Sequence, residues 1–193
     1  EQGQNLFLYF AVPITAGLVL LAPDLLPLLA GTDFLVERTL IAWIALGHLC
    51  LGIYSINSYL IDLSQRTGLF LIILLCAAGL NLALNALLIP RLGLPGAAMA
   101  TFAAYALQAT LLWSVTKRLV GFRLAWHPSW LLRCLAAAGL MSLLLRLLPA
   151  PTTLWQTISL ILAGALCYTG LTFLFLAREE RRRLLVLLAR GPA

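Results

Sequence analysis

Charged residues are scarce in this chain of 193 residues. Asp, Glu, Lys and Arg together make up 10% of the sequence, whereas an ordinary soluble domain contains about 25%. Apolar residues make up 62%. The sequence also lacks low-complexity linkers and any stretch long and polar enough to form a water-facing domain. This composition excludes a soluble globular protein and predicts an all-α protein embedded in a membrane.

Metal-binding patterns are also lacking. The two histidines and four cysteines are scattered, and the cysteines show no CxxC spacing, so neither a disulfide framework nor a zinc site is indicated. We expect no metal and no cofactor. All four cysteines fall in apolar stretches, where we expect them to be small buried packing residues: Cys50, Cys76, Cys134 and Cys167.

What the chain does have is six long apolar stretches, separated by polar, Pro or Gly breaks. Each contains the roughly 20 residues that a helix needs to cross ~30 Å of hydrocarbon at ~1.5 Å per residue. We therefore predict a polytopic membrane domain of six transmembrane helices over residues 1–177, with a basic amphipathic tail over 178–193 lying on the cytoplasmic membrane surface. The stretches cover about 5–29, 39–61, 67–89, 94–116, 128–147 and 153–176.

The first stretch contains two breaks, at Pro13 and at the Pro23-Asp24 pair. These predict a kinked helix whose last turns, near residues 25–29, lie at the membrane interface. The chain starts at Glu1 with neither a Met nor a basic leader, so we expect it to be part of a longer protein.

The orientation follows from the positions of Lys and Arg, because short loops rich in these residues stay in the cytoplasm. With six crossings, ten of the thirteen basic residues fall on one side, which places both ends of the segment in the cytoplasm. The net charge of +6 then reflects topology and contact with anionic lipids, and no basic, aromatic-rich surface for nucleic acid is present. Those ten are Arg66, Lys117, Arg118, Arg123, Arg133, Arg178, Arg181, Arg182, Arg183 and Arg190, against Arg38, Arg91 and Arg146.

Residues 81–118 read as a membrane-spanning helical hairpin. Pro90 is expected to end the first helix, because proline lacks a backbone donor, and Gly93, Pro95 and Gly96 are expected to restart the chain into the second helix. Small residues then recur at every fourth position, a spacing that lets helix backbones approach closely in lipid. They are Gly96, Ala100 and Ala104.

The segment LIPRLGLPGAAMAT, with its Asn-rich preceding span and the long helix that ends at Lys117-Arg118, resembles a hairpin of the polysaccharide and O-antigen flippases. These belong to the multidrug, oligosaccharidyl-lipid and polysaccharide exporter superfamily. The likeness extends upstream, through LLAPDLLPLLAGTDF and GIYSINSYLIDLSQRT, and covers about residues 10–119. The matching positions shape a turn and a packing face: Ile89, Pro90, Gly93, Gly96, Ala97 and Ala98.

The resemblance implies a carrier built from two six-helix lobes, of which this chain is the C-terminal one. The N-terminal lobe would be its partner. Such a carrier sits in the bacterial cytoplasmic (inner) membrane and moves lipid-linked oligosaccharides to the outer leaflet by alternating access. The implied ligand is a polyprenyl-diphosphate-linked glycan, which calls for cations at the cytoplasmic rim, polar groups in the cavity and an apolar seam for the tail. Membrane lipids would surround the lobe.

The second stretch carries a polar face. Its residues recur at steps of four, three, four and three, which places them on one side of a helix. We interpret them as a wall of the translocation cavity, with His48 or Asp62 as a candidate proton-coupling group, because ionisable residues inside a membrane are costly and often functional. The alternative is hydrogen bonding between helices. The face comprises His48, Gly52, Ser55, Tyr59 and Asp62.

Two further sets of polar side chains are candidates for contact with the glycan. Asn81 and Asn85 stand four residues apart in the third stretch, and Thr101, Tyr105 and Gln108 form a face of the fourth. Amides in hydrocarbon need hydrogen-bond partners, so helix-to-helix bonding is the alternative for both sets.

Three arginines, Arg66, Arg123 and Arg133, are candidates for binding the anionic headgroup, since guanidinium groups match phosphate oxygens bidentately. The alternative is that they set the topology and contact ordinary phospholipids. Asp62, four residues before Arg66, also fits a helical ion pair.

Other functional classes remain as alternatives. A membrane transferase acting on polyprenyl phosphates would need clustered carboxylates to hold Mg²⁺, and Asp62 is the one acidic residue near the cytoplasmic face before Glu179. We therefore expect no enzymatic activity. A multidrug or cation exporter of the same superfamily would be expected to carry an acidic residue deep in a helix, which this lobe lacks. A membrane scaffold without transport activity is the third alternative.

Overall fold

The computed structural model describes residues 2–30, 37–62, 67–119, 128–149 and 151–175, and within these ranges all regular structure is helical. The helix bounds agree with the six apolar stretches to within three residues. The helices are α1 (Gln2–Ala30), α2 (Arg38–Asp62), α3 (Thr67–Leu92), α4 (Leu94–Leu119), α5 (Pro128–Arg146) and α6 (Leu154–Phe175).

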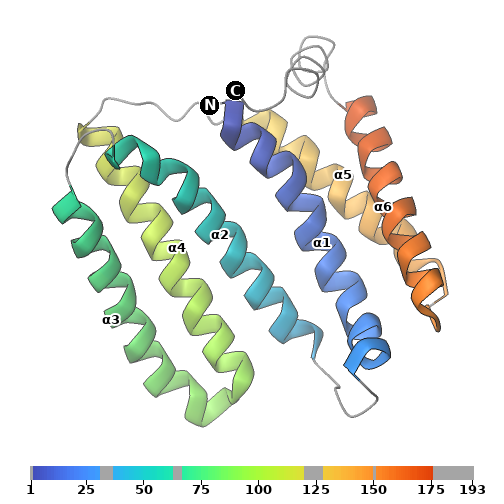
Figure 1. Ribbon diagram of the computed structural model, residues 1–193, viewed down its shortest axis with the longest axis horizontal. Helices are drawn as coiled ribbons and strands as arrows, with labels where there is room; N and C mark the ends of the chain where they lie inside the picture. Colours follow the sequence, from blue (N-terminus) through green and yellow to red (C-terminus); the bar gives the residue numbers. More distant parts are fainter. Residues whose placement is uncertain (1, 31–36, 63–66, 120–127, 150, 176–193) are drawn as a thin grey trace. The chain divides into compact units, whose positions relative to one another are not determined.

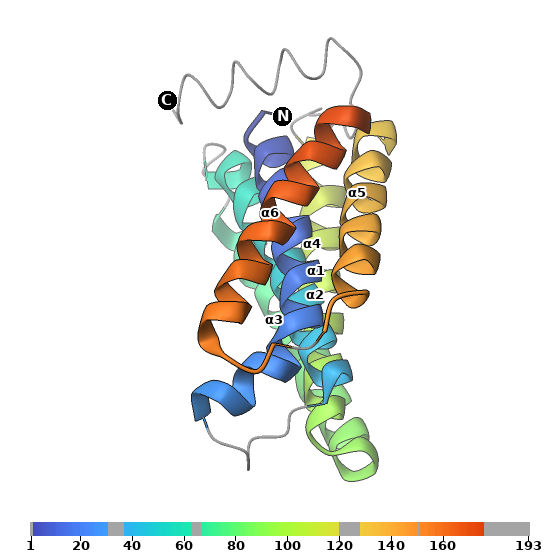
Figure 2. The ribbon, with the colours of Figure 1, turned by 90° about the vertical axis from the view of Figure 1, so that its right-hand side faces the viewer.

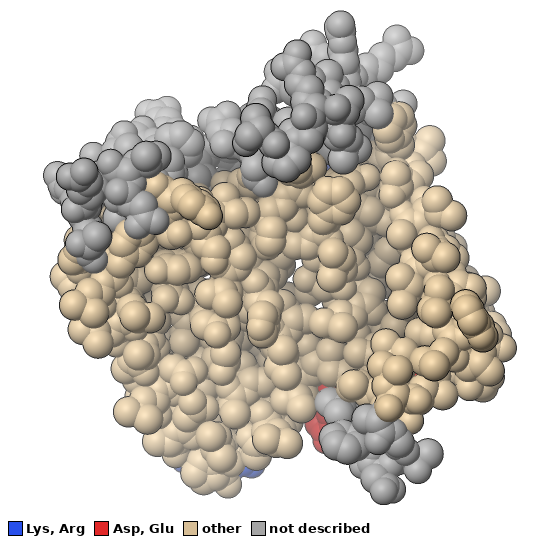
Figure 3. All heavy atoms as spheres, viewed as in Figure 1, with Lys and Arg blue, Asp and Glu red and all other residues tan. Residues whose placement is uncertain are grey.

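Five of these helices are long and apolar enough to cross a membrane, each over 22 to 26 residues: α1, α2, α3, α4 and α6. This fits a multi-pass membrane protein. The helix α5 has 19 residues and is not among the five, so the sixth crossing stays a prediction. In the view of Figure 3, few charged side chains of the described residues are visible on an otherwise uncharged surface.

The chain divides into two compact units. Residues 39–124 form one unit, and residues 1–38 together with 125–193 form the other. In Figure 1 the first of these contains α2, α3 and α4, and the second contains α1, α5 and α6. The N-terminal helix thus packs with the last two helices, although residues 31–127 separate them in the sequence.

Gly93 is the turn between α3 and α4. Its φ is +64°, in the left-handed region that glycine adopts at little cost. The Gly93 amide donates to the Ile89 carbonyl oxygen at 2.9 Å, and the Gly96 amide donates to the Gly93 carbonyl oxygen at 3.1 Å. These bonds satisfy backbone groups that the two helix ends would otherwise leave open. The predicted hairpin is present.

The prediction that Pro90 ends the first helix of the hairpin is wrong. The helix α3 continues through Pro90 to Leu92 and ends at Gly93. A proline in the last turn removes a single backbone donor, and that cost is small beside the packing of the hairpin. The left-handed glycine, and not the proline, sets the end of the helix.

The small-residue face of α4 packs as expected. Gly96, Ala100 and Ala104 are all buried. A Cβ atom at Gly96 would lie 2.6 Å from the Leu88 carbonyl oxygen of α3, so the two backbones are in direct contact there. Close approach of this kind is what small residues allow in lipid.

Further along the hairpin, Ile73 of α3 and Leu112 of α4 form a buried core, against which Tyr54 of α2 packs. The helix α2 approaches α4 at Gly47, where a Cβ atom would lie 3.5 Å from the Phe102 Cα. The Trp43 and Phe102 rings are stacked at a tilt, with centroids 5.2 Å apart. This unit is therefore a three-helix bundle in which α4 contacts both other helices.

In the other unit, α1 is continuous from Gln2 to Ala30 although it contains Pro13, Pro23 and Pro27. Figure 2 shows its last turns bent away from the rest of the helix, as the Pro23-Asp24 pair predicts. At the opposite end the Tyr9 ring of α1 contacts the Tyr168 ring of α6, with centroids 5.5 Å apart.

The four cysteines are free. Cys134 is fully buried on α5, and Cys50 and Cys167 are half-buried. Cys76, however, is exposed on α3, so the expectation that all four are buried is wrong for this residue. The exposed face of α3 is apolar on both sides of Cys76, and a thiol behaves there as one more small apolar group.

Candidate functional site

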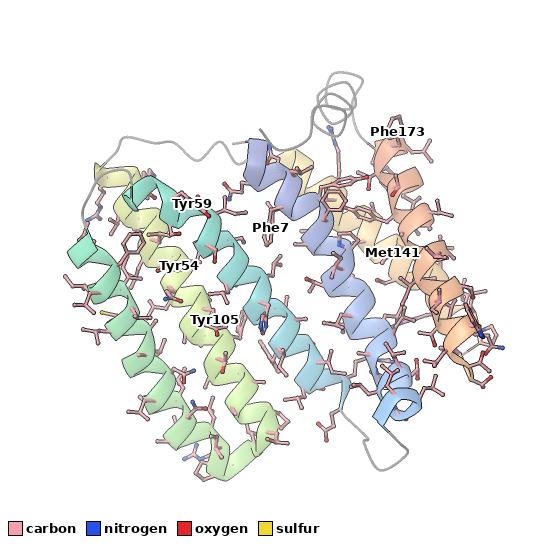
Figure 4. All side chains as sticks on the ribbon, in the orientation of Figure 1. Phe7, Tyr54, Tyr59, Tyr105, Met141 and Phe173 are labelled. Carbon is pink, nitrogen blue, oxygen red and sulfur yellow. The ribbon has the colours of Figure 1, made fainter. Side chains whose placement is uncertain are left out.

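The polar face of α2 is the strongest candidate site. Ser55, His48 and Tyr59 are exposed, and Tyr59 is the extreme case at 71% exposure, while Gly52 between them is half-buried. Figure 4 shows Tyr59 near the C-terminal end of α2. The side chain of Asp62 lies outside the described residues. The helix thus presents a strip of polar groups along a segment long and apolar enough to cross a membrane.

Two of these side chains are bonded back to their own helix. The His48 Nδ1 atom lies 2.9 Å from the Ile44 carbonyl oxygen, and the Ser55 hydroxyl donates to the Leu51 carbonyl oxygen at 2.9 Å. These bonds fix the rotamers of the two side chains. They do not use His48 Nε2 or the lone pairs of the Ser55 oxygen, and both residues are exposed, so these atoms can bond to a ligand.

On α4, Tyr105 is brought next to His48. The two rings meet edge to face with centroids 6.3 Å apart, and Tyr105 itself is half-buried. Thr101 donates to the Ala97 carbonyl oxygen at 3.0 Å, and Gln108 is buried at 5% exposure. The structure therefore joins two of the predicted polar faces at the His48–Tyr105 contact.

The Asn81 and Asn85 pair on α3 is half-buried. The Asn85 Nδ2 donates to the Asn81 Oδ1 at 2.9 Å, and the Asn85 Oδ1 is buried without a hydrogen-bond partner. An unpaired buried acceptor is costly. The bond of the pair runs along α3 itself, so the choice between helix-to-helix bonding and contact with a glycan stays a prediction.

Of the three headgroup candidates, Arg66 and Arg123 lie outside the described residues. Arg133 is half-buried on α5, next to the fully buried Cys134. It belongs to the unit of α1, α5 and α6.

Sequence reasoning missed Asn57. This α2 residue is buried at 4% exposure, and its Nδ2 donates to the Ile53 carbonyl oxygen at 2.7 Å. It lies on the packed side of α2, next to the exposed strip. The sequence feature that could have indicated Asn57 is its amide side chain within an apolar span.

Within the described ranges no group of three His, Cys, Asp or Glu side chains lies close enough to hold a metal ion. The exposed side chains of the strip offer hydrogen bonding by hydroxyl, imidazole and phenol groups. No protein-family model matches the chain, and no curated protein matches it in sequence.

Proposed function

We propose that the chain is the C-terminal six-helix lobe of a flippase that moves lipid-linked oligosaccharides from the cytoplasmic to the outer leaflet by alternating access. The observation that carries the proposal is the exposed polar strip on α2, formed by His48, Ser55 and Tyr59. Between Leu40 and Tyr59 the other exposed residues of this helix are Ile44 and Leu46, both apolar.

A polar strip of this kind is unfavourable against lipid, because hydrocarbon offers no hydrogen-bond partners. It is stable when it faces a second lobe or a water-filled cavity between two lobes. A glycan, which presents many hydroxyl groups, is a ligand that such a strip can bind through hydrogen bonds. The edge-to-face His48–Tyr105 pair adds an aromatic surface beside it.

The basic residues support the direction of transport. Lys117 and Arg118 lie in the last turn of α4, and the Lys117 ammonium lies 5.6 Å from the centre of the Trp113 ring. Trp and Lys together are typical of a helix end at a membrane interface. A cationic rim on the cytoplasmic side would attract the diphosphate of a lipid-linked glycan.

The test is a transport assay with the full-length protein in sealed proteoliposomes. We expect it to move a fluorescent polyprenyl-diphosphate-linked glycan between leaflets, measured as the growing fraction that an impermeant quencher can no longer reach, and protein-free vesicles to show no such movement. Proton-driven efflux of an organic cation without movement of the glycan would reject the proposal in favour of a drug exporter. Absence of both activities would favour a scaffold.

A further inference from the structure

The unit of α1, α5 and α6 contains an apolar groove that the proposed transport cycle does not use. Its volume is about 360 Å³, at the small end of the range for ligand pockets. One wall is α1, the other is α6, and Met141 and Leu145 of α5 form the floor. Figure 4 shows Met141 between α1 and α6.

Small residues create the groove. A Cβ atom at Gly17 of α1 would meet nothing within 4 Å, so this wall is open. On α6, a Cβ atom at Gly164 would lie 3.1 Å from the Leu145 Cδ1 of α5. The glycine therefore lets α6 pack closely against α5. The Tyr9 and Tyr168 rings, with centroids 5.5 Å apart, join the two walls at one end.

The lining offers almost nothing to a polar ligand. Among the described lining residues other than the two tyrosines, Thr169 alone has a hydroxyl, and that hydroxyl donates to the Ala165 carbonyl oxygen at 2.7 Å. Apolar cavities of this kind do not hold water. The helices α1 and α6 are apolar enough to cross a membrane, so the medium that reaches the groove is lipid hydrocarbon.

The dimensions select one lipid chain. Along α1 the lining runs from Tyr9 to Leu25, ~24 Å at ~1.5 Å per residue. A volume of about 360 Å³ is several times smaller than the volume that a helix with its diameter of ~10 Å would fill over this length. The α6 wall, from Leu160 to Thr169, is ~14 Å long, close to one leaflet of a ~30 Å hydrocarbon core.

We propose that this groove holds a single acyl chain of a bilayer glycerophospholipid as a resident lipid, seated between α1 and α6 over the floor of α5. The proposal requires the membrane setting but not the flippase activity. A bound chain would fill the space beside Gly17 and supply the van der Waals contacts that the open walls lack.

The test is photolabelling of the full-length protein in nanodiscs that contain phosphatidylcholine with a diazirine in its acyl chain, with adducts mapped by mass spectrometry. We expect adducts at Ile14 and Ile161 of the groove to exceed those at the exposed Leu82 of α3 about tenfold, which corresponds to ~1.4 kcal/mol of preference. Equal labelling of the groove and Leu82 would overturn the proposal.

Two matched pairs of variants separate filling of the groove from general damage. Gly17→Phe and Ala165→Phe place a ring in the groove and should abolish most labelling there. Gly170→Phe and Ala163→Phe make the same changes at exposed α6 positions outside the lining and should leave it unchanged.

Three results would contradict the proposal. The first is unchanged groove labelling in both filling variants. The second is labelling of the groove by a diazirine-bearing polyprenyl phosphate but not by the phosphatidylcholine probe, which would assign the groove to an isoprenoid chain. The third is cross-linking between two copies at Ile14 with no lipid adduct. All of these readouts are independent of glycan transport, so failure of this proposal and failure of the flippase assignment are distinguishable.

Discussion

Replacing Gly96 with valine is expected to lower the thermal stability of the protein more than any other single change considered. The added Cβ would lie 2.6 Å from the Leu88 carbonyl oxygen and 2.8 Å from its carbonyl carbon. These are backbone atoms of α3, which cannot move aside as a side-chain end can. Overpacking typically costs about 1–3 kcal/mol, and we expect the upper end of that range because two helix backbones must separate.

The measurement is the midpoint of thermal unfolding of the purified protein in detergent. Gly79→Val is the matched control, because Gly79 lies on α3 of the same hairpin and a Cβ atom there meets nothing within 4 Å. It should change the free energy of unfolding by no more than ~0.5 kcal/mol, since valine and glycine differ little in a helix interior. Equal midpoints for the two variants would show that the backbone contact at Gly96 does not hold the hairpin together.

The second large effect is expected on transport. Changing both Ser55 and Tyr59 to leucine removes two exposed polar groups from α2, at positions where neither side chain is part of a buried core. Each lost hydrogen bond to a bound glycan is worth ~0.5–1.5 kcal/mol, so the transport rate should fall about tenfold or more. The initial rate in the proteoliposome assay measures this, and the thermal midpoint should stay unchanged.

The control for the serine change is a Ser159→Leu variant in which Tyr59 is unchanged. Ser159 is exposed on α6, and its hydroxyl donates to the Gln156 carbonyl oxygen at 2.8 Å, much as Ser55 is bonded to its own helix. Ser159 lies outside the polar strip, so the Ser159→Leu variant should transport the glycan at the wild-type rate. A full rate in the α2 double variant would remove the strip from the substrate pathway.

The sequence predicts where the helices begin and end to within three residues, because the Pro, Gly and polar residues between the apolar stretches disfavour helix. The hairpin is the clearest example, since Gly93 needs a left-handed conformation and Gly96 a close backbone contact. The misplaced end of α3 at Pro90 shows the limit of such reasoning. A proline predicts a break from local chemistry alone, whereas packing against α4 decides whether the last turn is kept.

The arrangement of the helices could not be predicted in the same way. Spans that are apolar all round give no periodic signal of which side faces which neighbour. Nothing local to Tyr9 indicates that its ring meets Tyr168, about 160 residues later. The groove beside Gly17 depends on that pairing. For the candidate site, the spacing predicts that His48 and Ser55 share a face, but their exposure and the contact of His48 with Tyr105 come from tertiary packing.

Thiol labelling at the two ends of α3 tests most directly whether the chain threads the membrane in the predicted direction. Gly68 and Leu94 are both exposed, and the 25 residues of the span between them cover ~37 Å at ~1.5 Å per residue. In a background without the four native cysteines, a membrane-impermeant maleimide added to intact cells should modify Leu94→Cys, and should modify Gly68→Cys only after permeabilisation. Labelling of both positions from the same side, or of Gly68→Cys alone from outside, would contradict the account.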